Sequence, residues 1–560
     1  MRLFWCLPGF LLWASFPPMA EKTDVVFALA PLMWLARRSD PRTSAKRWFW
    51  NGIIFWVATL SWMPAIVKNG GPWPLVVLGW FALAAYCAAY FGLFGWLSAQ
   101  YWRWAREDAL RPAWIRGGGE YWKRLAGILL VEPILWCGLE LVRSRLLGGF
   151  AWNQLGVVPV NGGFGAPAAL GGVYLCSAVV ILVNGTFAGI AERVWKPERS
   201  GFALLKRLGT LETVLAFGLA WGVYQLAAMA RPETASDPDA PGLKVAMVQR
   251  NFPCVFKAQE ENPLEVYGRL FENVADLKPD LVVLSESAMC EFGPVDQQGA
   301  MRFAAWAAER TGGAALLAGG TRYVDGLTYN SAALYAATGD LPQSMTVDCY
   351  DKVHLVPFGE FIPGDKWITA LQKLAPVGSC TPGELKTLDL PNAFLPLGVA
   401  ICFEDTDSAQ MRELAAQGAR LLVFITNDSW FSQSNESVQH AWQAVARAIE
   451  TGLPVVRVGN SGVTGTISPD GKTTWLVGTD GRPLVDRSGT MLDRIMVKVQ
   501  GEVEQRDVDS DFRRSPSPSC FTFYTRYGDW PLAIAFALLI AGMILVKYRN
   551  NYEKRRYLSM

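Results

Sequence analysis

Hydrophobic patterning divides the chain into an apolar beginning, a polar middle and an apolar end. Long apolar runs fill the first 230 or so residues and return over the last 30. A helix needs about 20 apolar residues to cross the hydrocarbon core of a bilayer. The pattern therefore predicts a polytopic α-helical membrane bundle of about eight spans. These spans are residues 3–20, 23–37, 47–65, 73–98, 123–142, 168–192, 208–229 and 529–547.

The first of these runs has a second interpretation. Pro17, Pro18 and Ala20 resemble the cleavage region of a secretory signal peptide. A retained span is favoured because another apolar run follows at once and the charge pattern of the loops then alternates.

Lys and Arg gather in every second loop, and such loops face the cytoplasm in membrane proteins. The loops near 21–24 and 68–71 are poor in positive charge. This alternation predicts that both termini are cytoplasmic and that residues 231–528 lie outside. The positive clusters occupy residues 37–47, 103–124, 193–207 and 547–556.

The polar middle alternates short apolar runs with amphipathic stretches, which is typical of an α/β layered domain. Predicted strands are 243–249, 280–287, 314–320, 331–337, 396–405, 420–428 and 454–462, and predicted helices are 263–277, 297–312, 408–418 and 436–452. The predicted organisation is a transmembrane region (1–230), a linker (231–242), an extracytoplasmic domain (243–505), a second linker (506–528), a last span (529–547) and a basic tail (548–560).

Composition narrows the chemistry. The formal net charge is only +2, which gives no sign of the basic face that nucleic-acid binding needs. The chain has only two histidines, His354 and His440, although most hydrolytic triads and zinc sites use imidazole. Any reaction must depend mainly on carboxylates, amines and thiols, and we expect no metal and no other cofactor.

Three polar residues stand at or near the ends of apolar strands, where a side chain is rigidly held yet accessible. Glu286 follows DLVVLS, Cys402 lies in GVAICFED, and Lys352 follows a strand-like stretch. A thiol is mostly protonated at pH 7, so a nucleophilic cysteine needs a base and a stabilising cation. A carboxylate and a lysine supply both. Each residue taken alone is more often an ion pair, a cap or a small buried thiol.

The longer motifs around these residues give the pattern its specificity. Over residues 243–500 the chain resembles the nitrilase, or carbon–nitrogen hydrolase, superfamily, whose signature is Glu-Lys-Cys. More narrowly, DKVHLVPFGEFIP (351–363), ICFED (401–405) and NDSWF (427–431) resemble the apolipoprotein N-acyltransferase family. The resemblance implies that the extracytoplasmic domain is a nitrilase-like αββα sandwich and that it is catalytic.

Carried over residue by residue, the resemblance implies that Cys402 is the nucleophile, Glu286 the general base and Lys352 the cation beside the oxyanion. Glu360 and Glu404 are implied as supporting acids. Pocket positions are implied for Phe403, Asn427, Asp428, Ser429 and Trp430, with a small-residue turn at 459–462. The sequence departs from the family where LSES precedes the site in place of a Trp-Pro pair, and where Cys290 follows it.

The resemblance implies a two-step acyl transfer through a Cys402 thioester. The donor would be the sn-1 chain of a membrane phospholipid, and the acceptor the α-amine of an S-diacylglyceryl cysteine on a lipoprotein. The implied location is the bacterial inner membrane, with the catalytic domain on the periplasmic side. Two alternatives stay open: a membrane-anchored amidase with the same site, and a non-enzymatic scaffold that binds lipid or lipoprotein.

The other extracytoplasmic cysteines leave the disulfide pattern open. An oxidising compartment permits disulfides among them, but their number is odd and the connectivity cannot be deduced from sequence. These residues are Cys254, Cys290, Cys349, Cys380 and Cys520.

Overall fold

The computed structural model describes most of the chain as two compact units. The described residues are 6–109, 119–194, 211–230, 242–253, 261–337, 345–362, 379–393, 395–497 and 522–558. The first unit contains Met1–Pro64, Pro72–Ala230 and Tyr527–Met560, and the second contains Ala65–Gly71 and Arg231–Arg526.

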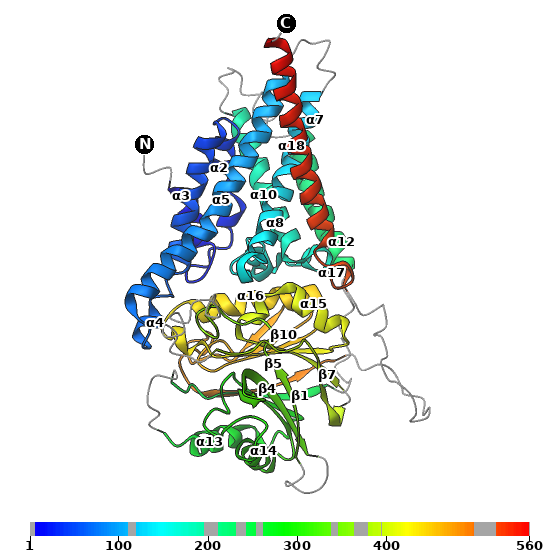
Figure 1. Ribbon diagram of the computed structural model, residues 1–560. Coiled ribbons are helices and arrows are strands. Elements are labelled where there is room, and N and C mark those ends of the chain that lie inside the picture. Colours follow the sequence, from blue (N-terminus) through cyan, green and yellow to red (C-terminus); the bar gives the residue numbers. More distant parts are fainter. Residues whose placement is uncertain are drawn as a thin grey trace. The chain divides into compact units, whose positions relative to one another are not determined.

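The first unit is helical (Figure 1). Its longer helices are α1 (Leu7–Ala14), α2 (Ala30–Ala36), α3 (Pro41–Thr59), α5 (Trp73–Ala109), α7 (Gly119–Ala126), α8 (Glu132–Arg143), α10 (Ala168–Val194), α12 (Leu211–Met229) and α18 (Trp530–Leu558). A short π-helix, η3 (Gly127–Val131), joins α7 to α8. Among the described residues, five helices are long and apolar enough to cross a membrane. They are Trp73–Arg106, Tyr121–Arg143, Ala168–Val194, Leu211–Met229 and Trp530–Arg549.

Among the described residues the helices therefore support five of the eight predicted spans, and the first three do not meet the same criteria of length and composition. Within 3–20 the described helix is only Leu7–Ala14, roughly 12 Å at the usual rise per residue. The apolar helical stretch within 23–37 is Asp24–Ala36, which is also too short. Helix α3 is longer, but its first turns carry Arg42, Lys46 and Arg47, so its apolar part is short. The predicted spans followed the number of apolar residues, which does not show where each helix begins.

A buried ion pair lies inside this unit. Nη2 of Arg37 lies 2.8 Å from Oε2 of Glu132, and both side chains are almost fully buried. Ser98 and Trp102 each donate to Oε1 of Glu132 at 2.9 Å. Arg37, which the charge pattern assigned to a cytoplasmic loop, is therefore one half of an internal ion pair.

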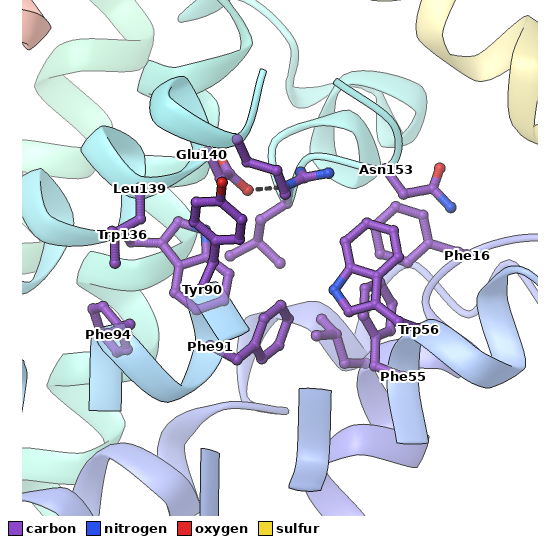
Figure 2. Close-up of a pocket in the computed structure, with 13 residues that line it drawn as sticks. Phe16, Phe55, Trp56, Tyr90, Phe91, Phe94, Trp136, Leu139, Glu140 and Asn153 are labelled. Carbon is purple, nitrogen blue, oxygen red and sulfur yellow. Dashed lines mark hydrogen bonds between the residues drawn. The ribbon is translucent and has the colours of Figure 1, made fainter. Parts of the chain in front are cut away.

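The same unit encloses a small aromatic cavity. Figure 2 shows the rings of Phe55, Trp56, Phe91 and Trp136 around it, with the carboxyl of Glu140 at its edge. Its volume is about 20 Å³, which leaves room for roughly one water molecule.

The second unit contains two six-stranded sheets. The first has the order β12-β1-β2-β3-β4-β5 and the second the order β11-β10-β9-β8-β7-β6. The strands of the first sheet are β1 (Leu243–Gln249), β2 (Leu281–Leu284), β3 (Ala315–Val324), β4 (Leu327–Ala337), β5 (Met345–Asp351) and β12 (Gly489–Ile495). Those of the second are β6 (Leu388–Leu390), β7 (Leu395–Ile401), β8 (Leu421–Thr426), β9 (Val455–Gly459), β10 (Gly465–Ile467) and β11 (Thr473–Trp475).

Each sheet has a parallel centre and antiparallel edges. Strands β1, β2 and β3 are parallel, with Val245 opposite Leu281 and Leu281 opposite Ala315. Strands β7, β8 and β9 are also parallel. Parallel strands need helical crossovers, which α13 (Pro263–Ala275), α14 (Gln298–Arg310), α15 (Ser408–Ala416) and α16 (Glu436–Thr451) supply.

The layers follow from residues that alternate along each strand. Val245 and Met247 of β1 join side chains of the second sheet, such as Val399 and Val423, in the core between the sheets. Ala246 and Val248 point the other way, into a core shared with α13 and α14. Helices α15 and α16 cover the second sheet (Figure 1). The result is the αββα order expected for the domain.

Candidate active site

The candidate nucleophile sits at an abrupt change of backbone direction. Strand β7 is fully buried except for one residue and ends at Ile401, and Cys402 opens the 3-10 helix η8 (Cys402–Thr406). Cys402 has φ +55°, a left-handed conformation that is costly for a residue with a side chain and that clusters at functional sites. The side chain is partly exposed and packs against the core between the sheets.

The candidate base and cation come from two strand ends of the first sheet. Glu286 follows β2 and Lys352 follows β5. Nζ of Lys352 lies 2.9 Å from Oε1 of Glu360 and 3.9 Å from Oε1 of Glu286. All three side chains are largely buried, Lys352 to within 1% of full burial. The structure therefore brings these three predicted residues into one buried ion cluster.

Asn330 completes this cluster, and its importance could not be seen in the sequence. Its single amide nitrogen donates to Oε1 of Glu286 at 2.8 Å and to Oε1 of Glu360 at 2.7 Å. An amide NH₂ has two hydrogens, so one nitrogen can serve both carboxylates. Asn330 lies in the polar first part of β4, just before the apolar run 331–337, so no pattern in the sequence distinguished it.

A glycine allows β3 to approach the base closely. A Cβ at Gly319 would lie 2.7 Å from Cα of Glu286 and 3.0 Å from the backbone nitrogen of Ser287. Ser287 itself has φ +64°. The turn that carries Glu286 is therefore both tightly packed and conformationally strained.

The electrostatics separate the two carboxyl groups. Burial, together with the charge of Glu360, raises the pKa of Glu286 despite the opposing effect of Lys352. Burial also opposes ionisation of Glu360, but the adjacent Lys352 ammonium lowers the pKa of Glu360 overall. Glu360 is thus the permanent partner of the ammonium, and Glu286 has the greater proton affinity that a general base uses.

The pKa values of Lys352 and Cys402 are both shifted by burial and by the nearby carboxylates. Burial alone would lower the pKa of Lys352, but the carboxylates of Glu360 and Glu286 raise it, so Lys352 stays protonated. Burial and the negative charge of Glu286 raise the pKa of Cys402 well above its usual value, with Lys352 opposing. The thiol is therefore protonated at neutral pH and needs a base at the moment of reaction.

Glu404 performs a structural task beside this cluster. Its Oε1 accepts hydrogen bonds from the Tyr350 hydroxyl at 2.9 Å and from the backbone nitrogens of Val353 and His354 at 2.8 and 3.1 Å. Its Oε2 accepts from the backbone nitrogen of Ile401 at 2.8 Å. Glu404 therefore ties the loop after Lys352 to the residue that precedes the candidate nucleophile.

The turn after β8 supports the candidate base. The backbone nitrogen of Asn427 donates to Oε2 of Glu286 at 2.9 Å. The side-chain oxygen of Asn427 accepts from Ser429 Oγ at 2.7 Å and from Asn460 at 3.0 Å. The turn continues as the 3-10 helix η9 (Asp428–Phe431).

Three other predicted pocket residues, Phe403, Ser429 and Trp430, contact residues outside the ion cluster. The Phe403 ring meets His354 edge-on, with ring centroids 5.7 Å apart. The backbone oxygens of Ser429 and Trp430 accept hydrogen bonds from Asn69 at 3.1 and 2.7 Å. Asn69 follows the short helix α4 (Ala65–Lys68). No pattern in the sequence associates this segment with the turn.

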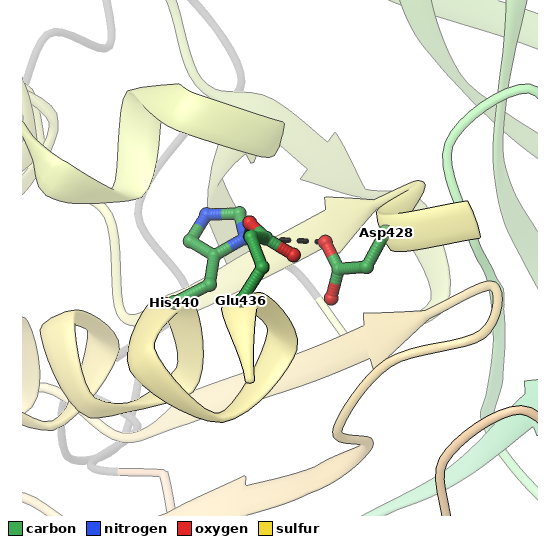
Figure 3. Close-up of side chains that lie close together, drawn as sticks. All are labelled: Asp428, Glu436 and His440. Carbon is green, nitrogen blue, oxygen red and sulfur yellow. Dashed lines mark hydrogen bonds and ion pairs between the residues drawn. The ribbon is translucent and has the colours of Figure 1, made fainter. Parts of the chain in front are cut away.

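Asp428 belongs to a separate buried group. Among the described residues, Asp428, Glu436 and His440 form the group of potential metal ligands that lie close enough to share an ion (Figure 3). Nη2 of Arg457 already approaches Oδ2 of Asp428 at 3.5 Å. Asp428 therefore already has a cationic partner within the protein.

The described cysteines of the second unit are not joined in disulfides. Cys290, Cys349, Cys380 and Cys402 carry free thiols. Cys254 and Cys520 lie outside the described residues, as does Pro363 at the end of the long motif.

Comparison with known proteins gives the family. A model described as the apolipoprotein N-acyltransferase N-terminal domain matches residues 8–186, and the carbon-nitrogen hydrolase model matches residues 244–506. A protein of Geobacter metallireducens named apolipoprotein N-acyltransferase is 30% identical over 558 residues, covering 96% of this chain and 94% of its own length. The chain belongs to the apolipoprotein N-acyltransferase family.

Two further relatives that bear this name have a similar percentage of identical residues. The protein of that name from Neisseria meningitidis serogroup B is 29% identical, with 84% of this chain and 87% of its own length covered. The one from Methylococcus capsulatus is 28% identical, with 97% and 95% covered. Among solved structures, an amidase from Nesterenkonia sp. is 17% identical over 46% of this chain and 91% of its own, with a TM-score of 0.33.

Proposed function

We propose that this chain is a phospholipid:apolipoprotein N-acyltransferase. It moves an sn-1 acyl chain from a membrane phospholipid to the α-amine of the S-diacylglyceryl cysteine of a lipoprotein. The observation that carries the proposal is the buried Glu286–Lys352–Glu360 cluster with Cys402 among its electrostatic partners. The cluster lies in the carbon-nitrogen hydrolase part of a chain whose relatives bear the acyltransferase name over nearly their full length.

In the first step Sγ of Cys402 attacks the carbonyl carbon of the sn-1 ester, and Glu286 takes the thiol proton. The Lys352 ammonium stabilises the tetrahedral oxyanion, because it is a fixed cation in a buried site. As the ester C–O bond breaks, Glu286 returns the proton to the departing lysophospholipid oxygen. A thioester on Cys402 remains.

In the second step the α-amine of the lipoprotein attacks the thioester carbonyl, and Glu286 takes a proton from the attacking nitrogen. The C–S bond breaks, the thiolate of Cys402 leaves, and the proton returns to it. The product is an amide, and the enzyme is back in its starting state. One carboxyl group thus serves as base and acid in both halves of the reaction.

The proposed location is the bacterial inner membrane, with the catalytic domain on the periplasmic side and both termini in the cytoplasm. Five apolar helices and the alternation of Lys and Arg between loops support it. Both substrates carry acyl chains anchored in a membrane, and a catalytic domain tethered to that membrane meets them at its surface.

A turnover assay separates this function from the alternatives. Purified full-length protein in detergent is given a phospholipid and a diacylglyceryl-cysteine peptide, and lysophospholipid and N-acyl peptide are quantified by mass spectrometry. We expect both products in equal amounts, and neither with Cys402→Ala. Release of free fatty acid without N-acyl peptide would instead indicate hydrolysis by an amidase-like enzyme, and no product would favour the scaffold.

A further inference from the structure

A cluster of five buried ionisable side chains connects the turn after β7, which carries Cys402, with the turn after β8, which carries Asn427. It is formed by Asp405, Asp428, Glu436, His440 and Arg457, each at most 4% exposed. They come from η8, η9, α16 and β9. Figure 3 shows Glu436 and His440 on one helix, facing Asp428 on the neighbouring turn. The proposed acyl transfer uses none of them.

The imidazole of His440 lies between two carboxylates. Its Nε2 is 3.0 Å from Oδ1 of Asp405, and its Nδ1 is 3.2 Å from Oδ1 of Asp428. A carboxylate oxygen lies close to each ring nitrogen, and two neighbouring carboxylates favour the positively charged imidazolium over the neutral ring. The geometry therefore favours a positive charge on His440.

The surrounding charges agree with this assignment. Burial alone would lower the pKa of His440, but Asp405 and the hydrogen bonds to both aspartates raise it to about 10. Arg457 opposes this rise, yet its own guanidinium binds Asp405 at 2.5 Å. Burial and the nearby Asp428 raise the pKa of Glu436 well above its usual value, so Glu436 is neutral. Two cations therefore balance two carboxylates.

Each of the two carboxylates belongs to a turn that the reaction uses. Asp405 stands three residues after Cys402 within η8. Asp428 directly follows Asn427, whose backbone nitrogen holds Glu286 at 2.9 Å. The position of Asp405 is therefore coupled to that of Cys402, and the position of Asp428 to that of Glu286.

Asp428 has no freedom to move independently of its turn. Its Oδ1 accepts a hydrogen bond from Thr426 Oγ1 at 2.7 Å. Its Oδ2 lies only 1.9 Å from the place that a Cβ would occupy at Gly462, so the glycine turn at 459–462 closes over it. Because the side chain is enclosed, the position of the Asp428 carboxylate and the position of the turn that carries it are coupled.

We propose that His440 is a positioning residue that fixes the turn carrying Cys402 relative to the turn carrying Asn427. It does so by holding Asp405 and Asp428 at a set separation, with Arg457 as the second cation. The inference rests on the proposed roles of Cys402 and Glu286 and adds a group that touches neither substrate. The ligand-like arrangement of Asp428, Glu436 and His440 is thereby explained as a charge-balanced support.

The test replaces His440 with Gln in the full-length protein and measures kcat and KM for N-acyl transfer, per natively folded molecule. A small misplacement of reacting groups can cost up to about 100-fold in rate. We expect kcat to fall roughly 10- to 100-fold, KM to change by less than about twofold, and alkylation of Cys402 by iodoacetamide to slow in parallel. A purely structural role would lower the folded fraction but not the rate per folded molecule.

The matched control is Tyr335→Phe. It also removes one buried hydrogen bond, from Tyr335 Oη to the backbone oxygen of Val295 at 2.6 Å, in the core shared with α13 and α14. Its kcat should equal that of the unmodified protein. A His440→Gln variant whose kcat stays within twofold, or falls only as far as in the control, overturns the proposal.

Two further measurements keep the outcome decisive. If His440→Gln does not fold, Thr426→Val removes only the hydroxyl that supports Asp428 and should still lower kcat at constant KM. Unchanged kcat in that variant overturns the proposal. Unmodified protein that forms no acyl adduct at all would refute the proposed function, whereas equal adduct formation by His440→Gln and unmodified protein would refute the positioning role alone.

Discussion

Replacing Glu404 with Gln tests whether this side chain organises the site through its hydrogen bonds. In the structure the carboxylate accepts four of them, three at Oε1 and one, from the backbone nitrogen of Ile401, at Oε2. Glutamine keeps the shape of the side chain, but one of its two oxygens becomes an NH₂ group. Whichever way the amide turns, at least one backbone N–H then faces a donor.

The magnitude follows from these contacts. A buried N–H left without an acceptor costs roughly 1–3 kcal/mol, and hydrogen bonds to a charged acceptor are stronger than those to a neutral one. The lost desolvation cost of the carboxylate offsets part of this. We therefore expect Glu404→Gln to lower the free energy of unfolding of the second unit by about 2 kcal/mol. Because Ile401 precedes Cys402, N-acyl transfer should fall as well.

The assay is pulse proteolysis of the full-length protein in detergent across a urea series, following fragments of the second unit. With a slope of roughly 3 kcal/mol per molar urea, the expected shift of the midpoint is about 0.7 M. Glu413→Gln makes the same chemical change at an exposed position of α15 and should leave the midpoint almost unchanged. Equal midpoints for the two variants would refute the structural role given to Glu404.

Four other results are expected. Lys352→Met leaves two buried carboxylates without their cation, so it should abolish N-acyl transfer and cost about 3–5 kcal/mol in the same urea assay. Gly319→Ala places a methyl group 2.7 Å from Cα of Glu286 and should displace that residue. A turnover assay should therefore show a lower kcat with a smaller change in KM. The pKa of His440 is raised from 6.5 to about 10, so its contribution to stability is complete below pH 6.5 and disappears as the pH rises through 10. The urea midpoint difference between unmodified protein and His440→Gln should shrink over that window. Treatment with a metal chelator should leave activity unchanged, and a loss restored by added divalent metal would contradict the expected metal-free site.

Much of the second unit was predictable because its central strands are buried on both faces. Such strands appear in a sequence as short continuous apolar runs, and β1, β2, β8 and β9 lie where those runs are. The predicted strand 396–405 extended too far, because the left-handed backbone of Cys402 ends β7 at Ile401. A conformation imposed by the surrounding fold leaves no mark in hydrophobic periodicity.

The edge strands and the spans were less predictable for related reasons. Strands β6, β10 and β11 are only three residues long, too short to form a recognisable pattern. Helix α3 carries both polar and apolar residues, and only its position in the fold decides which of them are buried.

Of the candidate site, the sequence indicated the residues with distinctive chemistry and missed those that act through contacts. Glu286, Lys352 and Glu360 were predicted from motifs, and they lie together. Asn330 and His440 are far from them along the chain, and only the fold brings them to the carboxylates that they hold.

The most direct test of the proposed function is to trap the acyl-enzyme. Purified full-length protein in detergent is incubated with a phospholipid labelled in the sn-1 chain, without acceptor, and its intact mass is measured. We expect one labelled acyl group, located on Cys402, sensitive to neutral hydroxylamine, absent from Cys402→Ala, and transferred to a diacylglyceryl-cysteine peptide when that is added. Folded protein that carries no adduct, or an adduct on another residue, would contradict the proposed mechanism.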